Sequence, residues 1–103
     1  QMKTNDLFKT HPLLSDRVRL AIMATLASEN TALSFTDLAE RLELSRGNLS
    51  AHIRKLEAEG LVEVKKEFID RKPCTSYFCT EQGLAALRNY LEQVESLLKQ
   101  TRS

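Results

Sequence analysis

Residues 35–64 constrain the fold more than any other part of the chain. Apolar residues recur there at helical spacing on both sides of a short break at residues 44–45, and an alternating apolar pattern begins directly after Gly60. This periodicity, with a capping serine before the second apolar run and a glycine after it, predicts a helix that ends at Leu42, a second helix over residues 45–59, and then a strand. A connection of so few residues between two helices is typical of a helix-turn-helix unit.

The second predicted helix has two chemically different faces. At about 100° per residue, Leu49, Ile53 and Leu56 fall on one side, which predicts a buried face. His52 lies at the edge of that face, where we expect it to pack with one ring nitrogen hydrogen-bonded. The opposite face is small, hydrogen-bonding or basic, with no acid before Glu57. Small side chains let a helix enter the major groove of DNA deeply, and Arg and Asn can bridge base edges there.

The outward face of this helix is therefore a candidate DNA-binding surface. An ordinary solvent-exposed helix face is the alternative interpretation of the same pattern. A domain that binds only other proteins is expected to present large apolar anchors on such a face instead. The residues that we expect to contact DNA are Arg46, Gly47, Asn48, Ser50, Ala51, Arg54 and Lys55.

Two strands are predicted within residues 61–80, on either side of turn-forming residues 70–73. They form a hairpin with a basic tip. We expect Arg71 and Lys72 at this tip to reach the minor groove of DNA. Two strand lysines are expected either to meet phosphates or, equally well, to keep the edge of the hairpin soluble. These strand lysines are Lys65 and Lys66.

A long helix is predicted after Thr80, and five apolar residues recur along it at steps of three and four. Such a narrow heptad seam suits a partner helix better than a broad globular core. We expect two copies of the chain to pair along it as a homodimer. The alternative is that the seam packs within one subunit. The five residues are Leu84, Leu87, Leu91, Val94 and Leu98.

These patterns predict a mainly α fold with a small β-hairpin, of the α+β class. A further helix is expected over residues 14–28, ahead of the helix-turn-helix. The 103 residues suffice for a single domain, residues 1–103, with one modest core. Within it we expect a core of residues 12–80 and a C-terminal dimerisation helix over residues 81–100.

Basic residues are concentrated in one part of the chain, although the net charge is small. The formal net charge is only +1, yet residues 45–80 hold seven Lys and Arg against five acids, which suits a local DNA footprint or a solvated face. The apolar runs are far too short to span a membrane, and nothing resembles a signal peptide. We therefore expect no membrane association and a cytoplasmic location.

The reactive residue types form no recognisable centre. Cys74 and Cys79 are expected on opposite faces of one strand, about 16 Å apart at about 3.3 Å per residue. An internal disulfide requires Cα atoms within about 7 Å, and strand cysteines are usually inert, so both a disulfide and a thiol switch are disfavoured. With His11 and His52 they show no metal-ligand spacing. No catalytic set or phosphate-binding loop is visible, so we expect no enzyme and no cofactor.

Five stretches of sequence occur in order: Phe35-Thr-Asp-Leu-Ala-Glu-Arg-Leu42, Leu44-Ser-Arg-Gly-Asn-Leu-Ser-Ala-His-Ile-Arg-Lys-Leu56, Glu59-Gly-Leu-Val-Glu63, Asp70-Arg-Lys-Pro73 and the residues from Tyr77 to Gly83. Together they resemble the winged-helix transcriptional regulators of the MarR and ArsR type, particularly the compact members with little beyond the winged helix. The likeness covers roughly residues 12–98.

This resemblance implies a winged helix-turn-helix fold with a recognition helix over residues 45–59 and a wing over residues 65–75. It also implies a homodimer, formed through the terminal helices, on a palindromic operator in double-stranded DNA. Metal-sensing members of the ArsR group carry a cysteine pair in the helix before the recognition helix or at its start. The preceding helix here, to Leu42, has no cysteine, which disfavours a metal sensor.

The expected function is thus sequence-specific, dimeric regulation of transcription without catalytic chemistry. A winged-helix module for protein–protein contacts without DNA binding is the alternative. The sequence leaves a small-molecule effector open.

Overall fold

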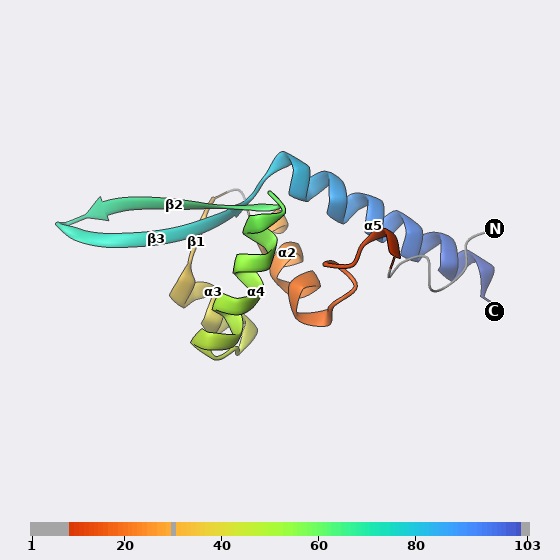
Figure 1. Ribbon diagram of the computed structural model, residues 1–103, viewed down its shortest axis with the longest axis horizontal. Helices are drawn as coiled ribbons and strands as arrows, with labels where there is room; N and C mark the ends of the chain where they lie inside the picture. The colour runs from red at the N-terminus through yellow and green to blue at the C-terminus, as the bar shows by residue number, and fades with distance from the viewer. Residues whose placement is uncertain (1–8, 30, 102–103) are drawn as a thin grey trace.

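In residues 9–29 and 31–101, which the computed structural model describes, a cluster of helices lies between a long β-hairpin and a projecting C-terminal helix (Figure 1). The molecule is elongated, with principal extents of 56 × 26 × 24 Å. None of the described helices is long and apolar enough to cross a membrane. In chain order the elements are α2 (Arg17–Ser28), β1 (Leu33–Ser34), α3 (Phe35–Leu42), α4 (Arg46–Ala58), β2 (Val62–Ile69), β3 (Lys72–Cys79) and α5 (Glu81–Gln100).

The helices begin at side chains that satisfy the free backbone N–H groups of the first turn. Ser34, Ser45 and Thr80 cap α3, α4 and α5, each by accepting a hydrogen bond from the N–H three residues later. A cap of this kind contributes about 1 kcal/mol to stability. The predictions that Ser45 and Thr80 start helices are confirmed. Thr36 lies inside the first turn of α3, after its cap Ser34.

The helix expected over residues 14–28 begins later than predicted, at Arg17. The reason is Asp16, whose carboxylate accepts hydrogen bonds from the N–H groups two and three residues further on and so defines the first turn. Leu14 lies in the turn before this cap. It is still buried, at 2% exposed, because the turn folds back onto the core.

The sheet is antiparallel with the strand order β1-β3-β2. The connection between β2 and β3 consists of Asp70 and Arg71 alone, with left-handed φ values of 53° and 67°. Two consecutive residues of this conformation match the right-handed twist of a hairpin. The turn expected over residues 70–73 is therefore shorter than predicted, and Pro73 lies in β3, opposite Phe68.

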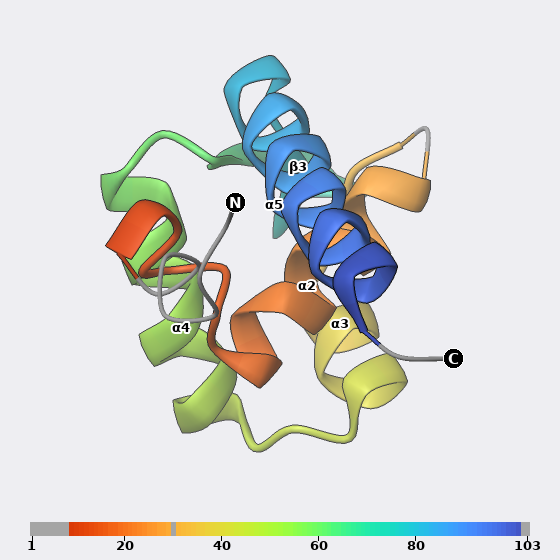
Figure 2. The same cartoon turned by 90° about the vertical axis from the view of Figure 1, so that its right-hand side faces the viewer.

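Helix α2 lies at the centre of the fold, against α3, α4, α5 and β3 (Figure 2). The predicted inner face of α4 packs onto it, because Leu49, Ile53 and Leu56 are at most 2% exposed. Burying an aliphatic side chain of this size contributes about 1.5–3 kcal/mol. Helix α4 is thus held by one face, and its opposite face is left to solvent.

A tight junction joins the base of the hairpin to α5. The Thr80 hydroxyl donates to the carbonyl of Gly60 at 2.7 Å and accepts from the N–H of Gly83 at 2.9 Å. A Cβ atom at Gly83 would lie 2.1 Å from the carbonyl oxygen of Leu61, so only glycine fits there. Gly60 has a φ of 75° and follows the last turn of α4, as predicted. This junction ties the end of α4 to the root of the hairpin.

Candidate nucleic-acid interface

The outward face of α4 is uncovered in the subunit. Of the seven residues expected there, Arg46, Gly47, Asn48, Ala51, Arg54 and Lys55 are exposed, and Ser50 is half-buried. Apart from neighbouring backbone of α4 itself, no atom of the described residues lies within 4 Å of the position that a Cβ atom would take at Gly47. The face therefore has open space at Gly47 and carries no large apolar side chain.

Two arginines on this face are held by other side chains, one by a residue of α3 and one by a residue of α4 itself. The guanidinium of Arg46 lies 4.9 Å from the centre of the Phe35 ring, which attracts the cation through its π face. Arg54 donates from Nη2 to the hydroxyl of Ser50, one turn earlier, at 3.2 Å. Each guanidinium has five donors, so most remain available to an external acceptor. The two contacts restrict where those donors point.

The inner edge of α4 is fixed by a polar contact. Arg19 of α2 donates from Nη1 to Nδ1 of His52, at 3.1 Å, and from Nε to the carbonyl of Leu13, at 2.9 Å. The prediction that His52 packs with one satisfied nitrogen is therefore confirmed. Arg19 itself was not among the predicted site residues. The spacing of residues along one helix could not predict the role of Arg19, because its partner His52 lies on another helix.

The N-cap of α2 belongs to the same network. The N–H of Arg19 donates to Asp16, and this hydrogen bond holds the pKa of the Asp16 carboxyl below its ordinary value of 3.8. Partial burial opposes the shift, while the charge of Arg19 adds to it. A carboxylate at this position also interacts favourably with the dipole of α2.

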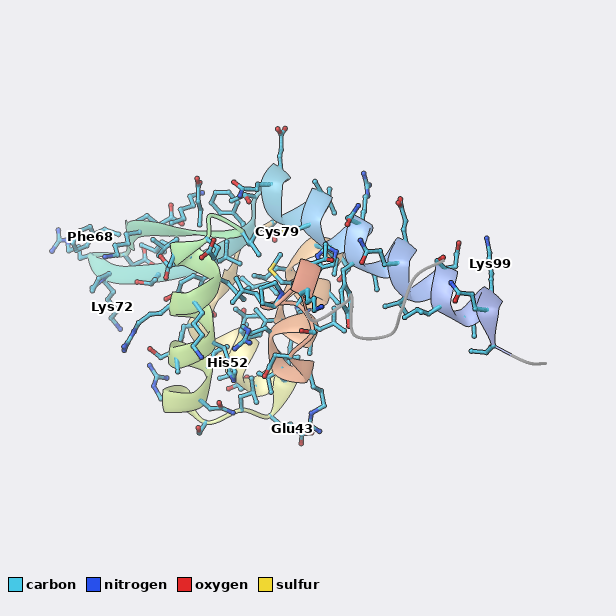
Figure 3. All side chains as sticks on the ribbon, turned by 45° about the vertical axis from the view of Figure 1, so that its right-hand side comes forward. Glu43, His52, Phe68, Lys72, Cys79 and Lys99 are labelled. Atoms are coloured by element: carbon cyan, nitrogen blue, oxygen red, sulfur yellow. The ribbon has the colours of Figure 1, made fainter. Side chains whose placement is uncertain are left out.

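The hairpin β2–β3 projects from the body of the domain, and it begins near the C-terminal end of α4 (Figure 1). Lys65, Arg71 and Lys72 are all exposed on it, as is Lys66. The ammonium of Lys65 lies 4.0 Å from a carboxylate oxygen of Glu67, so its charge is partly offset. Arg71 and Lys72 lie at the far end of the hairpin, where Figure 3 shows Lys72.

Residues 18–98 match the family model described as a winged helix DNA-binding domain. The chain belongs to this family. In this chain α3–α4 form the helix-turn-helix and the hairpin β2–β3 is the wing. The family is one of DNA-binding domains rather than enzymes. The fold expected from the sequence is thereby confirmed.

The chain is also similar to individual proteins over most of its length. The chain is 38% identical over 82 residues to an uncharacterised protein of Methanocaldococcus jannaschii, over 80% of this chain and 88% of that protein. It is also similar to a transcriptional regulator homologue from Pyrococcus horikoshii, with a TM-score of 0.84, 32% identity and 92% of each chain covered.

A MarR-family transcriptional regulator from Silicibacter pomeroyi shares the fold, with a TM-score of 0.65 and 21% identity, over 87% of this chain and 60% of that one. At this identity the likeness concerns the fold alone. It confirms the resemblance to the MarR type at that level.

The five apolar residues expected along α5 differ in their surroundings within this winged-helix subunit. Leu87 is 5% exposed and belongs to the subunit's own core, and Leu84 is half-buried. Leu91, Val94 and Leu98 are 47%, 37% and 68% exposed, in the part of α5 that extends beyond the body (Figure 1). The described part of the subunit therefore covers the first half of the seam and leaves the second half open.

The two thiols of the winged-helix domain are free and half-buried. Burial raises the pKa of the Cys79 thiol, which donates to the carbonyl of Thr80 at 3.4 Å. A raised pKa reduces the fraction of reactive thiolate at neutral pH. Among the described residues, no group of three or more His, Cys, Asp or Glu side chains is placed to hold a metal ion.

Proposed function

We propose that this winged-helix domain is a sequence-specific transcriptional regulator that binds double-stranded DNA as a homodimer. In this proposal α4 lies in the major groove and the tip of the hairpin lies at the minor groove. The supporting observation is the division of α4 into two faces. Leu49, Ile53 and Leu56 are buried, while the side that carries Gly47 and Ala51 is exposed and has no large apolar side chain.

The exposed polar groups of α4 suit base edges. Asn48 and Arg54 can each form two hydrogen bonds in one plane, which is the pattern that adenine and guanine accept in the major groove. Arg46, held against Phe35 near the start of the helix, is placed for a phosphate or a base. Ala51 lies between them, with a methyl group of the size that contacts a thymine methyl.

Dimerisation is proposed through the second half of α5. Leu91, Val94 and Leu98 follow one another at steps of three and four and are exposed in the subunit. Pairing two such helices buries these side chains and relates the two subunits by a two-fold axis. Two α4 helices about 34 Å apart then read half-sites separated by one turn of DNA, which requires a palindromic operator.

The decisive experiment is selection of bound sequences from a random pool of duplexes, followed by affinity measurements on the selected duplex. We expect a palindromic consensus and an affinity that falls steeply and log-linearly with salt concentration, by several ions per dimer. We expect Arg54→Ala to reduce the preference for the consensus over random DNA, and Arg71→Ala to weaken binding with a smaller salt dependence. Unchanged affinity of both variants for every duplex would contradict the proposal.

A further inference from the structure

The far end of the hairpin carries apolar side chains that the subunit does not cover. Phe68 is 77% exposed and Ile69 is 51% exposed, next to the two-residue turn. Single exposed apolar residues are common on protein surfaces. These two, however, lie at the extremity of an arm that projects far from the core, where Figure 3 shows Phe68 beside the end of the hairpin. Phe68 in particular gains little stability for the subunit from burial.

The strand register assigns Phe68 to a particular face of the hairpin. Side chains alternate between the faces of a strand, so Phe68 shares a face with Val62 and Val64, and its cross-strand partner there is Pro73. Val62 is 1% exposed, which identifies this face as the one that packs on the helices. Beyond the body of the domain, the same face continues uncovered to the tip.

The aromatic ring of Tyr77 confirms which side this is. Tyr77 is paired with Val64 and therefore lies on the same face. Its ring centre is 6.3 Å from that of Phe35, at the start of α3. The uncovered part of this face thus looks toward the side of the molecule on which the helix-turn-helix lies.

The acidic residues of strand β2 all lie on one face of the hairpin. Lys66 lies on the same face as Phe68, two residues before it. The opposite face carries both acids and the other two strand cations: Glu63, Glu67, Lys65 and Lys72. Beyond Val64, the helix side of β2 therefore presents a cation and an aromatic ring but no acid. An apolar contact bordered by cations is complementary to DNA, whose sugars are apolar and whose phosphates are negative.

We propose that Phe68 and Pro73 form an apolar contact with the deoxyribose walls of the operator's minor groove, with Lys66 at a flanking phosphate. This inference rests on the proposed function, because it needs α4 in the adjacent major groove. Proteins that bind the minor groove commonly place Phe and Pro side chains in it beside Arg and Lys. The wing then contributes an apolar contact in addition to the charge of Arg71.

The test compares Phe68→Ala with Ile69→Ala, a matched control that removes an exposed apolar side chain from the opposite face of the same tip. Affinities for the selected duplex are measured by fluorescence anisotropy over a range of salt concentrations. We expect Phe68→Ala to weaken binding about tenfold. Its salt slope should not change, because no cation is lost. Ile69→Ala should stay within about twofold of the unmodified protein, and Phe68→Leu should recover most of the affinity.

Lys66→Ala should differ from Phe68→Ala in the salt dependence of its binding. Loss of a phosphate contact should weaken binding and lower the salt slope by about one ion per subunit. Unchanged affinity of Phe68→Ala overturns the inference, and so does an equal loss in Ile69→Ala. A change in the sedimentation of Phe68→Ala also overturns it, because the tip then contacts a second copy of the chain.

Arg54→Ala, measured in parallel, separates this inference from the proposed function. If Arg54→Ala loses preference for the consensus while Phe68→Ala binds normally, only the contact of the wing is wrong. If Arg54→Ala also binds every duplex normally, the proposed function itself fails. Far-UV circular dichroism should be the same for all of these variants, because the substituted side chains are exposed.

Discussion

Arg19 of α2 and His52 of α4 are joined by a hydrogen bond of 3.1 Å between Nη1 and Nδ1. A guanidinium has no lone pair to offer, so Nδ1 of His52 is the acceptor and carries no proton. The same arginine reaches the carbonyl of Leu13. One side chain thus links the turn before α2, α2 itself and the inner edge of the helix that we propose reads DNA.

Replacement of Arg19 by methionine is expected to destabilise the domain by about 1–2 kcal/mol, because it leaves Nδ1 of His52 and the Leu13 carbonyl without their donor. Operator affinity should fall as well, since α4 loses a contact that orients it. Urea unfolding and anisotropy titrations measure the two effects. Arg17→Met, at an exposed position of the same helix, is the control. Equal unfolding free energies for the two variants would show that the network is unimportant.

Asp16 is expected to make stability depend on acid pH. Its pKa in the folded domain lies below the ordinary value of 3.8, chiefly because the N–H of Arg19 donates to it. The stabilisation is therefore complete above the unfolded pKa and is lost as the pH falls through the folded pKa. Asp16→Asn keeps a capping side chain but does not titrate. The unfolding free energy of this variant should fall less between pH 7 and pH 3 than that of the unmodified protein; equal decreases would exclude this role.

Two glycine-to-alanine substitutions should have opposite effects on folding. At Gly83 the added methyl group meets the Leu61 carbonyl at 2.1 Å, and we expect destabilisation by about 1–3 kcal/mol or more. At Gly47 the space is open, so Gly47→Ala should stabilise α4 by about 0.5–1 kcal/mol. Thermal unfolding distinguishes the two. Gly47→Ala should still bind the operator more weakly, because its methyl group stands between α4 and the groove.

Leu91→Glu is expected to convert a dimer into a folded monomer. Leu91 is 47% exposed in the subunit, so a carboxylate there is tolerated by the fold but not inside a helix pair. Sedimentation velocity should show the smaller species, and operator affinity should drop because one half-site is lost. Ala85→Glu, at an exposed position on the far side of α5, should remain dimeric. Identical sedimentation of both variants would place the interface elsewhere.

The two halves of α5 show what a heptad seam can predict. Leu87 and Val94, seven residues apart, occupy equivalent positions in the repeat, yet one is 5% exposed and the other 37%. The spacing identifies the apolar side of a helix, because that side depends only on helical geometry. It does not identify what covers each turn. Met23 of α2 lies beside Gly83 in the first turn of α5, whereas Leu91 and Leu98, further along, are exposed.

The hairpin shows a similar division. The alternation of residues after Gly60 indicates a strand pair, but Asp70 and Arg71 adopt left-handed conformations that favour glycine or asparagine. Proline is common in turns. The presence of Pro73 therefore led to the prediction of a longer turn than the two residues Asp70 and Arg71 that the structure shows. The full pairing of β2 with β3 carries Phe68 out to the exposed tip.

The order of this chain's residues determined the local features of the domain: helix caps such as Ser45 and Thr80, the buried side of α4 and the glycine that ends it. Each depends on atoms within about one helical turn, so a single segment contains the information. Tertiary structure alone decided that Arg19 supports His52, that Leu87 belongs to the core and that Gly83 touches Leu61. These contacts join segments distant in the chain, and their formation depends on how the elements pack.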